Sequence, residues 1–272
     1  VEKATLSISA VDDAVHSDGE TVVRSGEINV SKSYEGIEGA YVAISGGTIN
    51  IVSSDDGINA AGGVDSSGFS GPGQQQTTAK TEVYSNTLSN HFQLSGGTIW
   101  VNALGDGMDI NGSAEITGGK LIVSGPTAND NAALDVDTTF NITGGIVMGV
   151  GSSGMVIAPT ATSTQSNIVG NFASTQAANS IIHVVDADGN VVASFKSPKT
   201  FQSIVFSSAD IVKGKSYKIY VGGTVSGTAI GGYYSSGSIS GATLYGSVVA
   251  GSYVSSGGPG GPGGPGGTRP TR

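Results

Sequence analysis

The sequence predicts an all-β protein, a right-handed parallel β-helix (solenoid) with an irregular β region at its C-terminal end. Three observations lead to this prediction. A short unit repeats along the first part of the chain, each copy alternates apolar with polar residues, and most copies begin at a pair of glycines. Alternation with a period of two is typical of strands, and repetition at intervals of about 20–50 residues indicates a solenoid.

The unit is clearest at residues 45–60, where a Gly-Gly turn precedes Ile49 and Ile51 and an Asp-Asp-Gly-Ile-Asn corner follows them. The same order returns at residues 95–111 and 117–135, and earlier copies surround Asp13 and Glu35. Glu35 lies 22 residues after Asp13. No copy contains the apolar spacing of an amphipathic helix, and the fixed leucines of leucine-rich repeats are absent, so three short strands per coil remain.

Three apolar columns should face inward when the coils are stacked, because side chains alternate along a strand and each coil buries its apolar face against its neighbours. The first column follows the glycine turn, the second lies two residues later, and the third precedes the turn. These columns are Ile28, Ile49, Ile99, Leu121 and Val147; Val30, Ile51, Val101 and Val123; and Val23, Ile44, Leu94, Ile116 and Ile142. Gly149 falls where an apolar interior residue is expected, which suggests that the repeat becomes irregular there.

Composition limits the possible classes of protein. The chain has 45 glycines in 272 residues, well above the usual share of about 7%, as tight solenoid corners would require. Its net charge of −9 argues against a nucleic-acid partner. It has no cysteine and no apolar run long enough to form a transmembrane segment. Low lysine with abundant serine, threonine, asparagine and glycine suits a secreted or cell-surface (extracellular) bacterial protein.

Residues 1–256 are expected to form a single β-helix domain with a loop insertion near 63–90, followed by a flexible Gly/Pro-rich tail at 257–272. Beyond residue 150 the pattern remains β but loses its regular period. Residues 181–185 and 191–195 flank an Asp-Ala-Asp-Gly-Asn turn and predict a hairpin. That turn superficially resembles a calcium loop, but the later ligands of such a loop are missing, so turn formation is the preferred interpretation.

The chemistry is concentrated in the acidic corners. Aligned coils place Asp13, Glu35, Asp56 and Asp106 in one column. Three residues further on, a second column contains His16, Glu38, Asn59, Asp109 and Asp135. Stacked strands lie ~4.8 Å apart, so neighbouring carboxylates would repel by roughly 3.5 kcal/mol at an effective dielectric constant of ~20.

Either some of these carboxyls are protonated or a cation compensates them. A single corner would be explained by turn formation alone, but four copies favour a hard cation with oxygen ligands, and these spacings suit Ca²⁺ better than Mg²⁺. Zinc is disfavoured, because the chain has no cysteine and only three histidines.

The corner motifs also resemble a known family. The runs at residues 12–19, 33–39, 53–60 and 105–112 are similar to those of bacterial calcium-binding, carbohydrate-binding β-helices, whose fold is like that of pectate-type polysaccharide lyases. One member, from a cellulolytic clostridium, binds cellulose and pectic sugars. The similarity extends over roughly residues 4–225, and it implies Ca²⁺ at Glu35, Glu38, Asp56, Asn59, Asp106, Asp109 and Asp135. With the rest of the corners, the candidate metal ligands are Asp13, Glu35, Glu38, Asp55, Asp56, Asn59, Asp106, Asp109, Asn111 and Asp135.

Binding is favoured over catalysis. Elimination from a uronan needs a base besides Ca²⁺, and none of Arg24, Lys32 and Lys80 recurs at a fixed offset from the corner. The expected function is calcium-dependent binding of plant cell-wall polysaccharide (cellulose or polygalacturonate) without efficient cleavage. The alternatives are a pectate or polysaccharide lyase and a structural or adhesive surface solenoid.

Aromatic residues would supply sugar stacking. Trp100 lies between inward Ile99 and Val101 and should therefore point outward, near Asn50 of the same column. It could stack on a sugar ring or be covered by the 63–90 loop. Tyr233 and Tyr234 are a second candidate platform.

Overall fold

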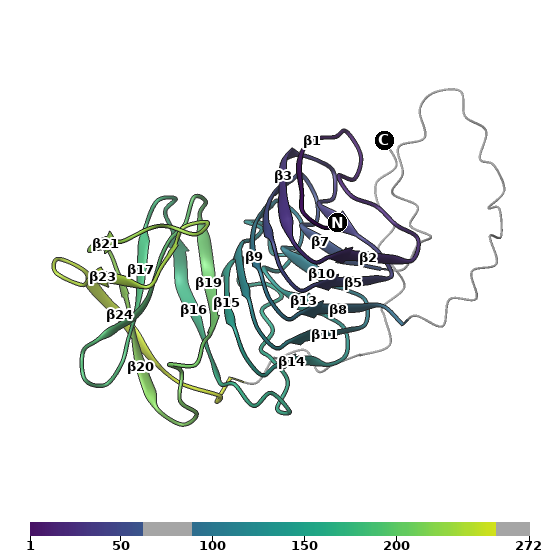
Figure 1. The fold of residues 1–272 in the computed structure, drawn as a ribbon. Helices are drawn as coiled ribbons and strands as arrows, with labels where there is room; N and C mark the ends of the chain where they lie inside the picture. Colours follow the sequence, from purple (N-terminus) through teal and green to yellow (C-terminus); the bar gives the residue numbers. More distant parts are fainter. Residues whose placement is uncertain (62–88, 254–272) are drawn as a thin grey trace.

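The computed structural model describes residues 1–61 and 89–253, and in this part of the chain every element of regular structure is a β-strand (Figure 1). The predicted parallel β-helix is confirmed, with about five turns. An antiparallel region follows it. The predicted 63–90 loop, apart from residues 89 and 90, and the predicted 257–272 tail lie outside the described residues.

The longest sheet of the solenoid contains six parallel strands and is extended by two antiparallel ones. In spatial order these are β1 (Ala4–Ser9), β3 (Gly26–Lys32), β6 (Thr48–Ser53), β9 (Thr98–Ala103), β12 (Lys120–Ser124), β15 (Ile146–Gly151), β19 (Phe201–Ser207) and β16 (Asn167–Gln176). Strand direction reverses between β15 and β19, so the parallel coils end with β15.

Two further parallel sheets close each coil. One contains β4 (Ile37–Glu38), β7 (Ile58–Ala60), β10 (Met108–Ile110) and β13 (Asp135–Val136). The other contains β2 (Glu20–Val23), β5 (Tyr41–Ile44), β8 (His91–Leu94), β11 (Ser113–Ile116) and β14 (Phe140–Ile142). The acidic corners lie between the long sheet and the β4–β13 sheet.

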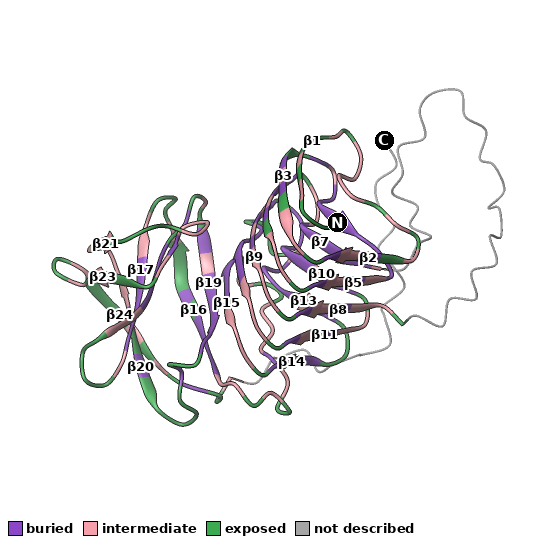
Figure 2. Ribbon diagram, viewed as in Figure 1, coloured by how far each residue is buried: buried purple, intermediate pink, exposed green. Residues whose placement is uncertain are grey.

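The three predicted apolar columns are confirmed by strand register. Ile49 pairs with Ile99 in the first column, Ile51 with Val101 in the second, and Ile44 with Leu94 in the third. All six side chains are at most 1% exposed. Gly149 pairs with Val123, as predicted, and Leu134 lies against the space that a larger residue would occupy. Figure 2 shows this buried interior along the strands of the solenoid.

The glycine pairs are required by the stacking of the turns. Gly47 has a φ of +92°, which L side chains rarely adopt. A Cβ atom on Gly46 would lie 2.4 Å from the carbonyl oxygen of Arg24 in the preceding coil. The Gly-Gly signal therefore marks both a left-handed backbone position and a close approach of two coils.

The C-terminal region forms an antiparallel sheet that contains, in spatial order, β22 (Tyr233–Tyr234), β18 (Val191–Lys196), β17 (Ile181–Val185), β20 (Ser216–Val221) and β24 (Thr243–Val249). A small ribbon pairs β21 (Thr224–Ser226) with β23 (Ser236–Ser238). The predicted hairpin is β17–β18, and Asp186 closes its turn by accepting hydrogen bonds from Asp188 and Asn190. This geometry is that of a turn, as the sequence indicated.

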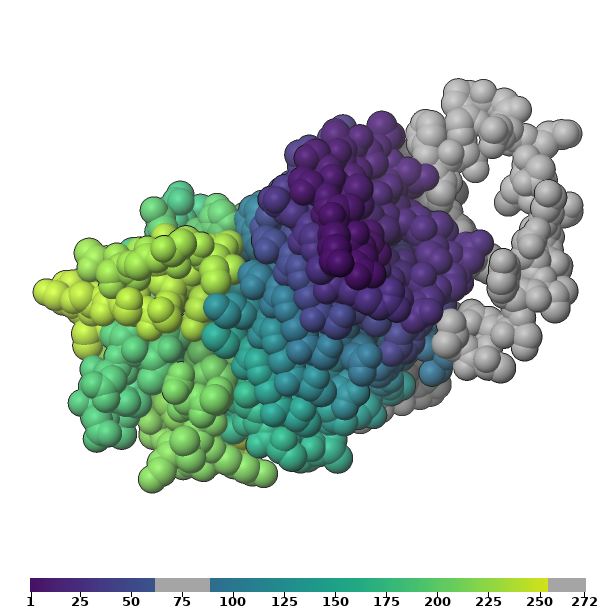
Figure 3. Space-filling model, in the orientation of Figure 1, coloured from purple at the N-terminus to yellow at the C-terminus, as the bar shows by residue number. Residues whose placement is uncertain are grey.

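This region has a second hydrophobic core. Phe195, Phe206 and Ile219 pack there with Ile122 and Met148, which point outward from the long sheet of the solenoid. The C-terminal region therefore covers part of the outer face of that sheet, and the two parts lie against each other (Figure 3). The sequence predicted the β17–β18 hairpin but not that this region would form a layer with its own core.

Candidate functional site

Strand register brings the acidic corners into the two predicted columns. In the first column, the backbone nitrogens of Gly36 and Gly57 donate to the carbonyls of Asp56 and Asp106, one coil further on. In the second, Asn59 pairs with Glu38 on one side and with Asp109 on the other, and Asp109 pairs with Asp135. The stacking that the sequence predicted is therefore present.

One group of carboxylates is formed by Asp56, Asp106 and Asp109, which we call the central cluster. Each offers an oxygen within 4.8 Å of the others. Asp56 Oδ1 accepts a hydrogen bond of 2.7 Å from the backbone nitrogen of Asp106, and Asp106 Oδ1 accepts one from the backbone of Ala132. These bonds fix the carboxylates while leaving other oxygen lone pairs available to a cation.

Glycine makes room for this arrangement. A Cβ atom on Gly105 would lie 2.4 Å from Oδ1 of Asp55 and 2.4 Å from Oδ1 of Asp56. Any larger residue at this position would displace one of these carboxylates. The Gly-Asp-Gly sequence at residues 105–107 thus allows acidic side chains of consecutive coils to meet.

The electrostatics of the central cluster are unfavourable when no cation is bound. Burial raises the pKa of Asp56 to about 8, and the charge of Asp109 adds to the rise. Burial also raises the pKa of Asp106 to about 8, although the hydrogen bond from Ala132 opposes this shift.

The same applies to the neighbouring residues. The pKa of Asp109 is raised to about 7 by burial and by the charge of Asp135. The pKa values of Asp55 and Asp135 are also raised, mainly by burial. A divalent cation would reverse these shifts by favouring the ionised carboxylates.

A second group is formed by Asp13, His16 and Glu38, which we call the first-coil cluster. Nδ1 of His16 is hydrogen-bonded to Glu38 Oε2, and Nε2 lies 3.1 Å from Asp18 Oδ1. Burial lowers the pKa of His16, but the hydrogen bonds with Glu38 and Asp18 outweigh it and the net shift is upward. The sequence placed His16 in the second column without counting it as a ligand, and its position three residues after Asp13 was the available signal.

Glu35 and Asn59 lie between the two clusters. Asn59 Nδ2 donates a hydrogen bond of 2.8 Å to Glu35 Oε2. Asn59 is 5% exposed, and its Oδ1 is buried without a hydrogen-bond partner among the described residues. A buried carbonyl oxygen is costly to leave unpaired, and it is an oxygen ligand of the type that Ca²⁺ prefers.

Asn111 belongs to neither acidic column, because it comes two residues after Asp109. It follows β10, its side chain is exposed, and its carbonyl oxygen accepts a hydrogen bond from Asn90 Nδ2. Asp135 belongs to the second column by register with Asp109 but is not part of the central cluster as defined by oxygen distances.

The aromatic candidates are less open than the sequence suggested. Trp100 does point outward from the long sheet, yet it packs against the C-terminal core and is half-buried. A Cβ atom on Gly231 would lie 1.8 Å from Trp100 Cδ1, so the covering segment is the turn at residue 231. Tyr233 is only 5% exposed and its ring stacks with that of Phe206, so the prediction that Tyr233 offers a platform for a sugar is wrong. Tyr234 is half-buried.

The candidate bases for catalysis are scattered. Arg24 is exposed beside a glycine turn, and Lys32 is exposed at the end of β3. Lys80 lies outside the described residues. Among the described residues, neither Arg24 nor Lys32 forms an ion pair with a carboxylate.

Comparisons with protein-family models, with curated proteins and with solved structures found no match. Within residues 1–61 and 89–253 there is no helix with the length and apolar character needed to cross a membrane.

Proposed function

We propose that this protein is an extracellular, calcium-dependent binder of plant cell-wall polysaccharide that does not cleave its ligand efficiently. The observation that carries the proposal is the central cluster, three partly buried carboxylates with oxygens within 4.8 Å of one another. The glycine corners allow consecutive coils to stack closely, and this stacking brings the carboxylates together. Because the carboxylates repel one another, binding of a cation is favoured.

Calcium suits the central cluster better than other common metals. The oxygen ligands are the three carboxylates and, on the neighbouring strand, the Asn59 amide, whose residue pairs with Asp109. Ca²⁺ takes 6–8 oxygen ligands in flexible geometry, with water supplying the remainder. Mg²⁺ needs a stricter octahedron and retains more water. Asp56, Asp106 and Asp109 would hold the ion, which would neutralise charge between consecutive coils.

A bound cation would make the binding of an acidic polysaccharide compatible with the negative net charge of the protein. A protein with a net charge of −9 repels a uronan, but a bound divalent cation would offset most of the negative charge of the central cluster and could bind a uronate carboxylate directly. The outer face of the solenoid also offers polar residues in register. Asn50 Nδ2 donates to Asn29 Oδ1 across two strands at 2.7 Å.

The support for polysaccharide does not come from aromatic stacking. Trp100 is covered by the turn at Gly231, so polar side chains and bound cations would make most of the contacts. A lyase is the alternative that a specific observation favours, since Lys199, whose pKa burial lowers to about 8, donates a hydrogen bond to the carbonyl of Ala103, three residues before Asp106.

The experiment is paired. Depletion of the protein from solution by insoluble cellulose and by insoluble pectate is measured with Ca²⁺ and with a chelator, together with the absorbance of unsaturated products from soluble polygalacturonate. We expect depletion that requires Ca²⁺ and negligible product. Depletion by neither polymer would favour a structural or adhesive solenoid, and rapid product formation would favour a lyase.

A further inference from the structure

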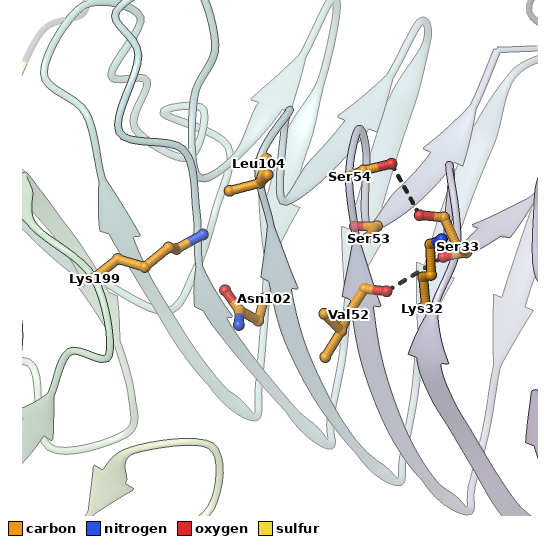
Figure 4. Close-up of a pocket in the computed structure, with 8 residues that line it drawn as sticks. All are labelled: Lys32, Ser33, Val52, Ser53, Ser54, Asn102, Leu104 and Lys199. Atoms are coloured by element: carbon orange, nitrogen blue, oxygen red, sulfur yellow. Dashed lines mark hydrogen bonds between the residues drawn. The ribbon is translucent and has the colours of Figure 1, made fainter. Parts of the chain in front are cut away.

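A groove opens beside the acidic corners, on the outer side of the long sheet (Figure 4). Its volume is about 270 Å³, close to the lower end of the ~300–1,000 Å³ that is typical of ligand pockets. The ends of β3, β6 and β9 form one side, and Lys199, between β18 and β19, lies on the other. The residues that line it include Lys32, Ser33, Ser54, Asn102, Leu104 and Lys199.

Two cationic side chains in one groove are unusual for this protein, which has only 12 lysines and arginines against 21 acidic residues. Neither Lys32 nor Lys199 forms an ion pair with any residue in the described parts of the chain. Lys199 Nζ donates to the carbonyl oxygen of Ala103, and this carbonyl brings no full negative charge. Burial lowers the pKa of Lys199 to about 8, which is the effect of an ammonium group without a counter-ion.

The rest of the lining suits a sugar. Asn102 has an amide that makes no hydrogen bond to the described residues, so both its donor and its acceptor are available. Ser54 Oγ donates to the carbonyl of Ser33 at 3.0 Å and can still accept from a hydroxyl. Leu104 is 56% exposed and offers an apolar surface for the C–H groups of a ring.

The groove is adjacent to the proposed ion site in the chain. Ser54 is followed directly by Asp55 and Asp56, and Leu104 is followed by Gly105 and Asp106. A polymer that lies in the groove would therefore pass beside the acidic corners. A flexible anionic polymer with repeated charges can use both the lysines and a bound cation.

We propose that this groove binds acidic sugar, with Lys32 and Lys199 on opposite sides of the groove to pair with its carboxylates, and with Asn102 and Leu104 against its ring. The inference rests on the proposed function for the class of ligand and adds the place and the chemistry of recognition. It implies that the protein binds uronans in preference to neutral glucans. Cellulose has no group that would compensate these two ammonium charges.

The test compares Lys199→Gln, Lys32→Gln and the double variant with the native protein in a buffer containing Ca²⁺. Lys218→Gln is the matched control, since Lys218 is an exposed lysine on β20 that does not line the groove. Affinity is measured by titration calorimetry for a galacturonate oligomer, for the same oligomer with its carboxyls reduced, and for a cello-oligomer. Melting curves establish that each variant is folded, and Lys32→Gln at the exposed end of β3 is the variant least able to disturb packing.

We expect each groove variant to lose about tenfold or more in affinity for the galacturonate oligomer, as a lost charge-assisted contact would cause. Lys218→Gln should bind as the native protein does, and the reduced oligomer should bind no better than the cello-oligomer. If both single variants and the double variant bind with native affinity, the groove is not the binding site for the acidic sugar, while the proposed function stands. Equal affinity of the native protein for the acidic and the reduced oligomers would overturn carboxylate recognition, and absence of any binding would overturn both proposals.

Discussion

Asp56 Oδ1 accepts a hydrogen bond from the backbone nitrogen of Asp106 at 2.7 Å, although the two residues are 50 positions apart in the sequence. The bond joins consecutive coils through the acidic corner. It also places two carboxylates of raised pKa next to each other. The stability of the solenoid and the occupation of the proposed ion site are therefore expected to depend on each other.

Removal of calcium should lower the melting temperature. An ion that binds the native corner and not the unfolded chain stabilises the native state by about 2.7 kcal/mol when its concentration is 100 times the dissociation constant. Differential scanning calorimetry with Ca²⁺, with a chelator, and after restoring Ca²⁺ measures this. A melting temperature that does not change on verified removal of the metal would contradict the proposal.

Asp106→Asn should have opposite effects with and without the ion. The amide oxygen can still accept the hydrogen bond from Ala132, while the variant removes one buried charge. At pH 8 the ion-free variant should be more stable than the ion-free native protein, by roughly 1–3 kcal/mol. Added Ca²⁺ should stabilise the variant much less than the native protein.

The control is Asp188→Asn, because Asp188 is an exposed carboxylate on the β17–β18 turn. Denaturant unfolding of the three proteins with and without Ca²⁺ gives the free energies. Parallel losses in both conditions would mean that Asp106 acts only in packing, and the central cluster would not be an ion site.

Without a cation, stability should fall as the pH rises. The carboxyls of Asp56 and Asp106 have pKa values of about 8 in the folded protein, above the ordinary 3.8. Below the ordinary value both states are protonated and no penalty applies. Between about pH 4 and pH 8 the unfolded state releases protons that the folded state keeps, so the free energy of unfolding decreases.

This pH dependence is measured by denaturant unfolding in chelator from pH 4 to pH 8.5, and we expect a decrease on the order of several kcal/mol. Ca²⁺ should flatten the curve, because the ion favours the ionised carboxylates. A free energy of unfolding that rises across this range in chelator would show that the corner carboxyls are not forced together in the ion-free state.

Gly231→Ala should separate the C-terminal region from Trp100. The new methyl group would lie 1.8 Å from Trp100 Cδ1 at a φ of +55°. We expect a loss of about 1–3 kcal/mol in stability and a red shift in the fluorescence of Trp100, the single tryptophan of the chain. Gly241→Ala is the control, since Gly241 has a φ of +77° with nothing within 4 Å of a Cβ atom. Equal fluorescence in the two variants would mean that the turn at residue 231 does not cover the ring.

The solenoid could be predicted from sequence because its determinants are local and repeated. Ile49, Ile99 and Leu121 occupy the same place in successive copies, so one alignment fixes both the strands and their register. The packing of the C-terminal region on the solenoid could not be predicted. Ile122 and Met148 point outward, and nothing in their own coils indicates that later strands of the C-terminal region cover them.

The same distinction applies to the site. The acidic corners repeat, so the stacking of Asp56, Asp106 and Asp109 was predictable. The covering of Trp100 was not predictable, because the turn at Gly231 has no counterpart in the repeat. The sequence also contained no indication that Lys199 would lie beside the solenoid. It lies in a segment without periodicity, and only the folded chain brings its ammonium group to the carbonyl of Ala103, 96 residues earlier.

The reversal of direction between β15 and β19 has a consequence for how this architecture can be lengthened. A parallel coil added after β15 would need the edge that β19 already occupies. An additional coil can instead be inserted between existing parallel neighbours such as β9 and β12, whose edges match. Each inserted coil would add one residue to each acidic column, so the number of ions that the molecule can bind could be increased one coil at a time.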